Sequence, residues 1–202
     1  MKLKTLIPKS EVRRIVVQRR KGISADEIRS KTKLIVERLI ALDDFISAKK
    51  VHSYISTKTG EFDTRYIIDF MSNNGKSIVI PKLNKQSKKF QHASFIGWNK
   101  LVKNSEGYYE PPVGYDDDLS GIDLMIVPAI AVSVLGQRVG YGGGYYDLLL
   151  KNTGALKIVP AFEFQVFDNI ETEVHDMRID KIVTELRVIN TRQQIKQNSE
   201  SV

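Results

Sequence analysis

The chain has 202 residues, which suits one domain of ordinary size, and its 42% apolar and 27% charged residues exclude wholesale disorder and collagen-like or coiled-coil repeats. The absence of cysteine excludes disulfides, thiolate metal sites and a cysteine nucleophile. No apolar run reaches the ~18–20 residues that span a bilayer, and the basic N-terminus leads into no apolar signal stretch. We therefore expect a soluble, cytoplasmic protein with no membrane partner.

The net charge of +7 is concentrated near the N-terminus. Residues 1–21 hold eight lysines and arginines against one acid, so the rest of the chain is neutral. A nucleic-acid-binding domain usually carries a basic face across its whole fold. The basic segment could therefore hold a polyphosphate, a nucleic-acid backbone, or no ligand at all.

A first helix is predicted to begin at Pro8, because proline has no backbone N–H and a residue in the first turn of a helix needs none. Its apolar stripe leaves Lys9, Arg13 and Arg20 near a common basic side. The run 24–27 has the pattern of a capping box and predicts the start of a second helix.

Six segments have the apolar pattern of strands. They are 51–55, 77–81, 90–96, 121–128, 157–162 and 181–184. The fourth is apolar on both faces, as a central parallel strand would be, and the third is expected to be exposed. Helices are predicted between strands, one from an Asp63 cap to near Gly75 and one over 145–151. This alternation predicts an α/β fold, with a mainly parallel central sheet flanked by helices in three layers.

A single domain is expected over residues 1–189, followed by a flexible C-terminal tail over 190–202. Residues 99–120 are rich in turn formers and predict a long loop, and loops of this length in compact domains are usually functional or mobile. No internal repeat is present, and we expect a monomer.

A glycine-rich segment, Gly136–Asp147, holds five of the thirteen glycines. Glycine lets backbone N–H groups approach a ligand, and such groups at the start of a helix form an anion-binding nest. The segment follows the predicted central strand, and ligands of open α/β sheets bind at that end of a strand. Its spacing fits neither the dinucleotide pattern G-x-G-x-x-G nor the P-loop, so a tight turn that serves packing stays an alternative.

Charged side chains in the N-terminal segment and in the glycine segment suit a phosphate ligand. Arg138 can fork onto phosphate oxygens, and Asp147 could hold Mg²⁺ or simply favour the first turn of a helix. Lys9 and Arg13 are four residues apart on one helix face, so they could clamp one polyphosphate or form a solvated basic face.

The string Gly136-x-Arg-Val-Gly-Tyr-Gly-Gly-Gly-Tyr-Tyr-Asp147 resembles the signature of the 5-formyltetrahydrofolate cyclo-ligases, also called methenyltetrahydrofolate synthetases. Further matches follow in the family's order over residues 8–186. They are Lys9-Ser-Glu-Val-Arg13, Glu61, Glu110-Pro-Pro112, Asp123–Pro128, Phe162–Gln165, His175-Asp176 and Asp180–Thr184. One departure is Val132-Ser133, where many members have Phe-Asp.

The resemblance implies the architecture of sugar-phosphate isomerases and coenzyme A transferases, and an ATP- and Mg²⁺-dependent cyclisation. The substrate would be 5-formyltetrahydrofolate, with or without a polyglutamate tail, and the products 5,10-methenyltetrahydrofolate, ADP and phosphate. The residues implied for ATP are Lys9, Arg13, Arg138, Val139, Gly140, Tyr141, Gly142, Gly143, Gly144, Tyr145 and Tyr146, with Lys9 and Arg138 also catalytic. Those implied for folate are Ile55, Glu61, Tyr108 and Tyr145, and those for Mg²⁺ are Asp147 and Asp176.

The implied reaction is phosphorylation of the formyl oxygen followed by attack of nitrogen 10. Phosphoryl transfer needs positioning and charge neutralisation more than a protein nucleophile, so the absence of a Cys or Ser–His arrangement is no objection. Two other functions stay open. One is an isomerase or coenzyme A transferase of the same architecture, which needs no ATP, and the other is a small nucleic-acid-binding protein that uses the basic first helix. The latter leaves the glycine segment unexplained, so we expect no nucleic-acid partner.

His52, inside a predicted strand, could be a catalytic base or a structural side chain. Alternating neighbours favour a structural histidine whose ring nitrogens are hydrogen-bonded. We therefore expect no role for it in the chemistry.

Overall fold

In the computed structural model of the chain, the structure describes residues 6–84, 86–87, 89–105, 107–114 and 119–200. Parts of three predicted features lie outside these residues, namely the start of the basic segment at 1–5, positions 106 and 115–118 of the long loop, and the end of the C-terminal tail at 201–202. No helix within the described ranges is both long enough and apolar enough to cross a membrane.

A seven-stranded sheet forms the centre of the molecule, in the order β12-β11-β9-β6-β1-β2-β3. The strands are β1 Lys50–Ser53, β2 Ser77–Asn84, β3 Lys89–Ser94, β6 Leu124–Ile126, β9 Leu156–Pro160, β11 Lys181–Val183 and β12 Val188–Asn190. The inner strands are parallel, whereas the edge strands β3 and β12 run antiparallel to their neighbours. The prediction of a mainly parallel α/β sheet is confirmed.

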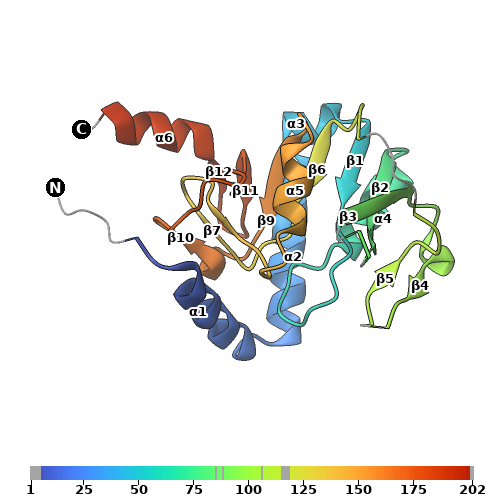
Figure 1. The fold of residues 1–202 in the computed structure, drawn as a ribbon, viewed down its shortest axis with the longest axis horizontal. Coiled ribbons are helices and arrows are strands. Elements are labelled where there is room, and N and C mark those ends of the chain that lie inside the picture. The colour runs from blue at the N-terminus through green and yellow to red at the C-terminus, as the bar shows by residue number, and fades with distance from the viewer. Residues whose placement is uncertain (1–5, 85, 88, 106, 115–118, 201–202) are drawn as a thin grey trace.

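Helices cover both faces of this sheet (Figure 1). Helices α2 Ala25–Ile40, α3 Asp43–Ser47 and α4 Arg65–Asn73 pack on one face, and α5 Tyr145–Lys151 packs on the other. The remaining helices are α1 Lys9–Lys21, which belongs to a separate core cluster, and α6 Thr191–Glu200. In β6, Leu124 and Ile126 pack with α2 and α4 whereas Met125 packs with α5, because successive side chains of a strand point to opposite faces. The predicted capping box is also present, since the side chains of Ser24 and Glu27 each accept the other's backbone N–H.

A second, smaller sheet lies against α1. It consists of β10 Val166–Phe167, β7 Ala131–Ser133 and β8 Arg138–Val139. Val12 and Val16 of α1 are fully buried in the same core cluster as Val139. None of these three short strands was predicted from the sequence. The glycine segment consequently begins after β7 and contains β8, rather than directly following the central strand β6, which corrects its predicted placement.

Two local predictions are wrong in detail. The helix α4 is preceded by Thr64 in the capping position, while the Asp63 carboxylate accepts the backbone N–H of Arg65 at 3.0 Å. Strand β3 is half-buried rather than exposed, because His92 and Ala93 pack inward.

Two segments are more regular than the sequence predicts. The long loop contains the 3-10 turn η1 Trp98–Lys100 and a short hairpin of β4 Val102–Lys103 with β5 Tyr109–Glu110. Residues 190–200, expected to be a flexible tail, belong to the end of β12 and to α6. The buried Thr191 hydroxyl anchors the start of α6 by donating to the carbonyl of Ile179 at 2.6 Å.

Candidate active site

A cavity of about 730 Å³ lies where α1, the loop after β1, the β4–β5 hairpin and the glycine segment converge. Nearly all of the site residues named from the sequence line it. They are Lys9, Arg13, Ile55, Glu61, Tyr108, Arg138, Gly140, Tyr141, Gly142, Gly143, Gly144, Tyr145, Tyr146, Asp147 and Asp176. Val139 is the exception, because its side chain is buried in the core beneath α1.

The first helix places two cations at one end of this cavity. The Lys9 ammonium lies 2.7 and 2.6 Å from the two carboxylate oxygens of Asp176, and 3.4 Å from the carboxylate of Glu173. The Arg13 guanidinium donates through Nε to the carbonyl of Gly140 at 3.0 Å. One turn of α1 therefore reaches both the glycine segment and the 173–176 loop.

Arg138 is the buried cation of the site. Its Nη2 donates to the Asp147 carboxylate at 2.8 Å and its Nη1 to the carbonyl of Pro128 at 3.2 Å, while its Nε has no partner among the described residues. A Cβ at Gly140 would lie only 2.7 Å from Nη1, so a side chain there would displace the guanidinium. Glycine at this position gives the arginine its place at the cavity wall.

Two acids predicted to share a metal ion both line the cavity, but each is paired with a different cation. Asp147 contacts Arg138, and Asp176 contacts Lys9. Burial raises the pKa of Asp176, but the backbone N–H of Glu173 and the Lys9 ammonium lower it by more, so the carboxylate stays ionised. Ligand atoms of Glu173, His175 and Asp176 lie within 4.8 Å of one another, and Asp147 is outside this group.

Glu61 is a buried acid in the cavity lining, 9% exposed. Its carboxylate accepts the backbone N–H groups of Thr57 at 3.4 Å and Lys58 at 3.1 Å, and the hydroxyl of Tyr141 also donates to it. Burial raises the pKa of Glu61, against the backbone N–H groups and the nearby Arg20 guanidinium, which lower it. The ionised Glu61 carboxylate is a strong hydrogen-bond acceptor, and its neighbours oppose the effect of burial on its pKa.

Aromatic side chains form part of the cavity wall. The rings of Tyr145 and Tyr146 lie 5.9 and 5.0 Å from the ring of Phe90 on β3. Tyr108 on the hairpin contacts the Lys58 ammonium through its hydroxyl and its ring face. All four rings line the cavity, and aromatic faces of this kind can pack on a planar heterocycle.

The comparison with known families bears on this geometry. A model of the 5-formyltetrahydrofolate cyclo-ligase family matches residues 7–185. The chain belongs to this family.

Individual relatives agree with the family match. The 5-formyltetrahydrofolate cyclo-ligase of Escherichia coli (strain K12) is 27% identical over 180 residues, which cover 86% of this chain and 98% of that protein. The enzyme of the same name from Mus musculus is 28% identical over 181 residues, which cover 83% and 89%. The solved structure of Aquifex aeolicus 5,10-methenyltetrahydrofolate synthetase has a TM-score of 0.80 and 30% identity, and covers 91% of this chain and 93% of its own.

Several cavity residues of this family member were not among those named from the sequence. Lys58, Phe90 and Glu173 line the cavity, and Arg20 lies behind Glu61. The only sequence signal for Arg20 was its place on the basic side of the first helix, and Lys58 and Phe90 carried none. Glu173 could have been noticed, because it stands two residues before His175 in an acidic loop.

His52 differs from its expectation in one respect. It is fully buried outside the cavity lining, as a structural histidine would be, but neither ring nitrogen has a hydrogen-bond partner among the described residues. Its ring packs edge-on against His92 with centroids 5.3 Å apart. Burial, and to a smaller extent His92, lower the pKa of His52 to about 3, so the ring is neutral in the folded protein.

Proposed function

We propose that this chain catalyses the ATP- and Mg²⁺-dependent cyclisation of 5-formyltetrahydrofolate to 5,10-methenyltetrahydrofolate, with release of ADP and phosphate. The single observation that carries the proposal is the cavity itself. It is lined both by three cations, Lys9, Arg13 and Arg138, and by a buried acceptor, Glu61, in a chain of the cyclo-ligase family. Its volume of about 730 Å³ lies within the ~300–1,000 Å³ of small-molecule sites.

The cationic end would hold the triphosphate. Arg138 presents a planar fork of donors, Lys9 a point charge, and the backbone of Gly142–Gly144 approaches without side chains. These groups neutralise charge that spreads over the phosphoryl oxygens in the transition state, which is the main requirement of phosphoryl transfer. No side chain needs to form a covalent intermediate.

The donor set also fits a magnesium ion. Asp147 and Asp176 both offer hard carboxylate oxygens to the cavity, and Mg²⁺ is usually held by one or two carboxylates together with substrate phosphates. A bound Mg²⁺ would supply charge neutralisation at the phosphate oxygens. The backbone N–H of Glu173 and the Lys9 ammonium keep Asp176 ionised, and the ionised carboxylate is the form that binds a metal cation.

The part of the cavity around Glu61 would orient the folate. Glu61 would accept N–H donors of the pterin, while Ile55, Tyr108 and Tyr145 would pack on the rings. Held in this way, the formyl oxygen takes the γ-phosphoryl group and the N5–carbon bond gains double-bond character. Nitrogen 10 then attacks that carbon and loses its proton, and the carbon–oxygen bond breaks with phosphate as the leaving group.

The same geometry bears on the other functions considered for the sequence. Lys9 and Arg13, which a nucleic-acid-binding helix would present to solvent, are turned into the cavity and engaged by Asp176 and Gly140. An isomerase or transferase would need no triphosphate end. A small-molecule substrate is therefore proposed as the partner, and a monomer, the cytoplasm and the absence of a nucleic-acid partner stay predictions.

The experiment is a direct assay of the full chain with 5-formyltetrahydrofolate, ATP and Mg²⁺, followed by the absorbance of the methenyl product and by ADP release. We expect product only when ATP and Mg²⁺ are both present, with one ADP per product. Omission of ATP and of Mg²⁺ are the controls. Absence of ATP-dependent product at micromolar enzyme would reject the proposal, and thermal stabilisation by a phosphorylated sugar without MgATP would favour an isomerase.

A further inference from the structure

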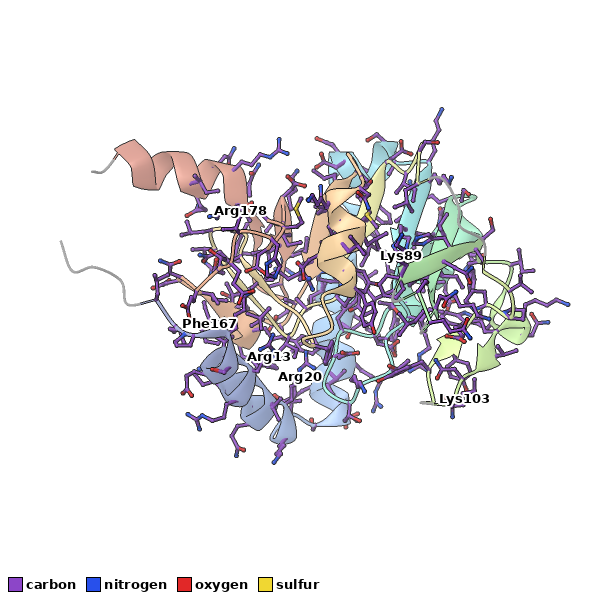
Figure 2. All side chains as sticks on the ribbon, in the orientation of Figure 1. Arg13, Arg20, Lys89, Lys103, Phe167 and Arg178 are labelled. Atoms are coloured by element: carbon purple, nitrogen blue, oxygen red, sulfur yellow. The ribbon has the colours of Figure 1, made fainter. Side chains whose placement is uncertain are left out.

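Arg20 is a basic residue of the first helix that takes no part in the chemistry proposed above. Lys9, Arg13 and Arg20 are spaced by four and seven residues, so they share one face of α1, and the labelled Arg13 and Arg20 lie on the side of α1 toward the centre of the molecule (Figure 2). Part of this face lines the cavity. Lys9 and Arg13 lie at its cationic end. Arg20 lies two turns further on, behind Glu61 and outside the cavity lining.

Arg20 is held in place by packing as well as by charge. Its side chain is only 10% exposed, and burial lowers the pKa of the guanidinium. Its aliphatic part lies against Gly60, where a Cβ would be 3.0 Å from the Cβ of Arg20. Gly60 also has a φ of +78°, so glycine suits both the backbone and the close approach of the arginine.

The guanidinium reaches Glu61 by two routes. Arg20 Nη1 lies 3.8 Å from a carboxylate oxygen of Glu61, and the same nitrogen donates to the hydroxyl of Tyr141 at 3.1 Å. That hydroxyl in turn donates to Glu61. Arg20, Tyr141 and Glu61 thus form a chain of donors that ends on the acceptor proposed for the pterin.

We propose that Arg20 is a positioning residue, which keeps Glu61 ionised and correctly oriented both directly and through the hydroxyl of Tyr141. The inference rests on the proposed function for the role of Glu61, but the contacts themselves do not. A buried carboxylate that loses its nearby cation takes up a proton more readily, and a protonated Glu61 offers a poorer acceptor to N–H donors. Arg20 would therefore govern folate affinity without touching folate.

The surroundings of Glu61 make Arg20 the main candidate for this task. The titratable and charged groups that face it are Arg20 from α1, Lys58 from its own loop, Tyr54 after β1, Tyr141 from the glycine segment and Tyr146 from α5. Burial raises the pKa of both Tyr54 and Tyr146, so neither supplies charge. Lys58 is exposed and engaged with Tyr108, which leaves Arg20 as the buried cation beside Glu61 in the described structure.

The test replaces Arg20 by methionine, which keeps an unbranched stem against Gly60 and removes the charge. The affinity of 5-formyltetrahydrofolate is measured by calorimetry without ATP from pH 6 to pH 9, and the titration of Glu61 in the free protein by carboxyl ¹³C NMR, assigned with Glu61→Gln. We expect the Glu61 pKa to rise by about one unit or more, and the variant to bind folate about tenfold more weakly at pH 6. The ratio of variant to wild-type Kd should shrink toward pH 9, because Glu61 is ionised in both proteins there.

Three further variants separate positioning from a general loss of structure. Arg20→Lys keeps the charge and should restore most of the affinity, and Tyr141→Phe should shift the titration in the same direction by less. Arg14→Met removes an equal charge from the exposed side of α1 and should change neither readout. An unchanged Glu61 titration in folded Arg20→Met, or a Kd ratio that is flat with pH, would overturn the inference. If the wild type fails to bind the folate, the proposed function fails, whereas the NMR titration still decides the role of Arg20.

Discussion

The guanidinium of Arg138 donates to the carboxylate of Asp147 at 2.8 Å, so a group proposed for phosphate and a group proposed for Mg²⁺ neutralise each other. Lys9 and Asp176, whose ammonium and carboxylate lie 2.6 Å apart, neutralise each other in the same way. Binding of MgATP would exchange each internal pair for phosphate on the cation and metal on the acid. Charge balance is kept through the exchange, which lowers the electrostatic cost of holding both sets of charges in one cavity.

Asp147→Asn should nearly abolish turnover and leave the fold intact. We expect kcat/KM to fall by about 100-fold or more, because a metal ion at phosphate oxygens contributes several kcal/mol of charge stabilisation. The asparagine oxygen can still accept from Arg138, so unfolding free energy should drop by no more than ~1–3 kcal/mol. Steady-state kinetics and thermal denaturation check both parts, with Asp26→Asn on the exposed start of α2 as the control. Near-normal activity at saturating Mg²⁺ would make Asp147 a helix-capping acid only.

Glu61→Gln should act on the folate and spare the nucleotide. An ionised acceptor facing N–H donors contributes ~1.5–3 kcal/mol, so KM for 5-formyltetrahydrofolate should rise about 10- to 100-fold. KM for ATP should change by less than about threefold, because in the described structure Glu61 makes no hydrogen bond or ion pair with Lys9, Arg13 or Arg138. Equal changes in both KM values would show that Glu61 supports structure instead.

Lys9→Ala and Arg13→Ala should each weaken the use of ATP, whereas Arg14→Ala should not. The first two side chains line the cavity, and Arg14 is exposed and paired with Glu11. A charge-assisted hydrogen bond to a phosphate contributes ~1.5–3 kcal/mol, so each of the first two substitutions should raise KM for ATP about 10- to 100-fold.

The same three variants distinguish an ATP clamp from a nucleic-acid arm. In a nucleic-acid arm, the slope of log oligonucleotide affinity against log salt concentration should fall by about one for each cation removed, whichever cation it is. ATP kinetics and oligonucleotide affinity at several salt concentrations give the answer. A graded loss that follows total charge, with Lys9 and Arg13 no more important than Arg14, would remove the assignment of these residues to ATP.

Stability should fall in mild acid because of His52. Its pKa is about 3 when folded and near 6.5 when unfolded, so the unfolded chain binds the extra proton between these values. The unfolding free energy is therefore unaffected by His52 above pH ~6.5 and should decrease by about 1.4 kcal/mol for each pH unit below it. Urea unfolding from pH 8 to pH 5 measures this slope. His52→Leu should flatten it, the exposed His175→Gln should not, and equal slopes in wild type and His52→Leu would contradict the prediction.

The sequence by itself determined the features that depend on neighbours along the chain. The capping box at Ser24 and the shared face of Lys9 and Arg13 follow from helix geometry, which repeats every 3.6 residues. The run Leu124–Ile126, apolar at every position, could only suit a strand covered on both faces, as β6 is. The glycine segment marked the site for a similar reason, because its five glycines can be read along the chain.

Only the tertiary structure decided which distant residues share the cavity. Glu61 meets Arg20 and Tyr141 because α1 packs on the small sheet that carries the glycine segment, and no local pattern encodes that packing. The hairpin that brings Tyr108 to Lys58 has strands of two residues, which are too short to show a period. Contacts of this kind depend on where the whole chain buries its apolar surface, and that is a property of the complete fold rather than of any one segment.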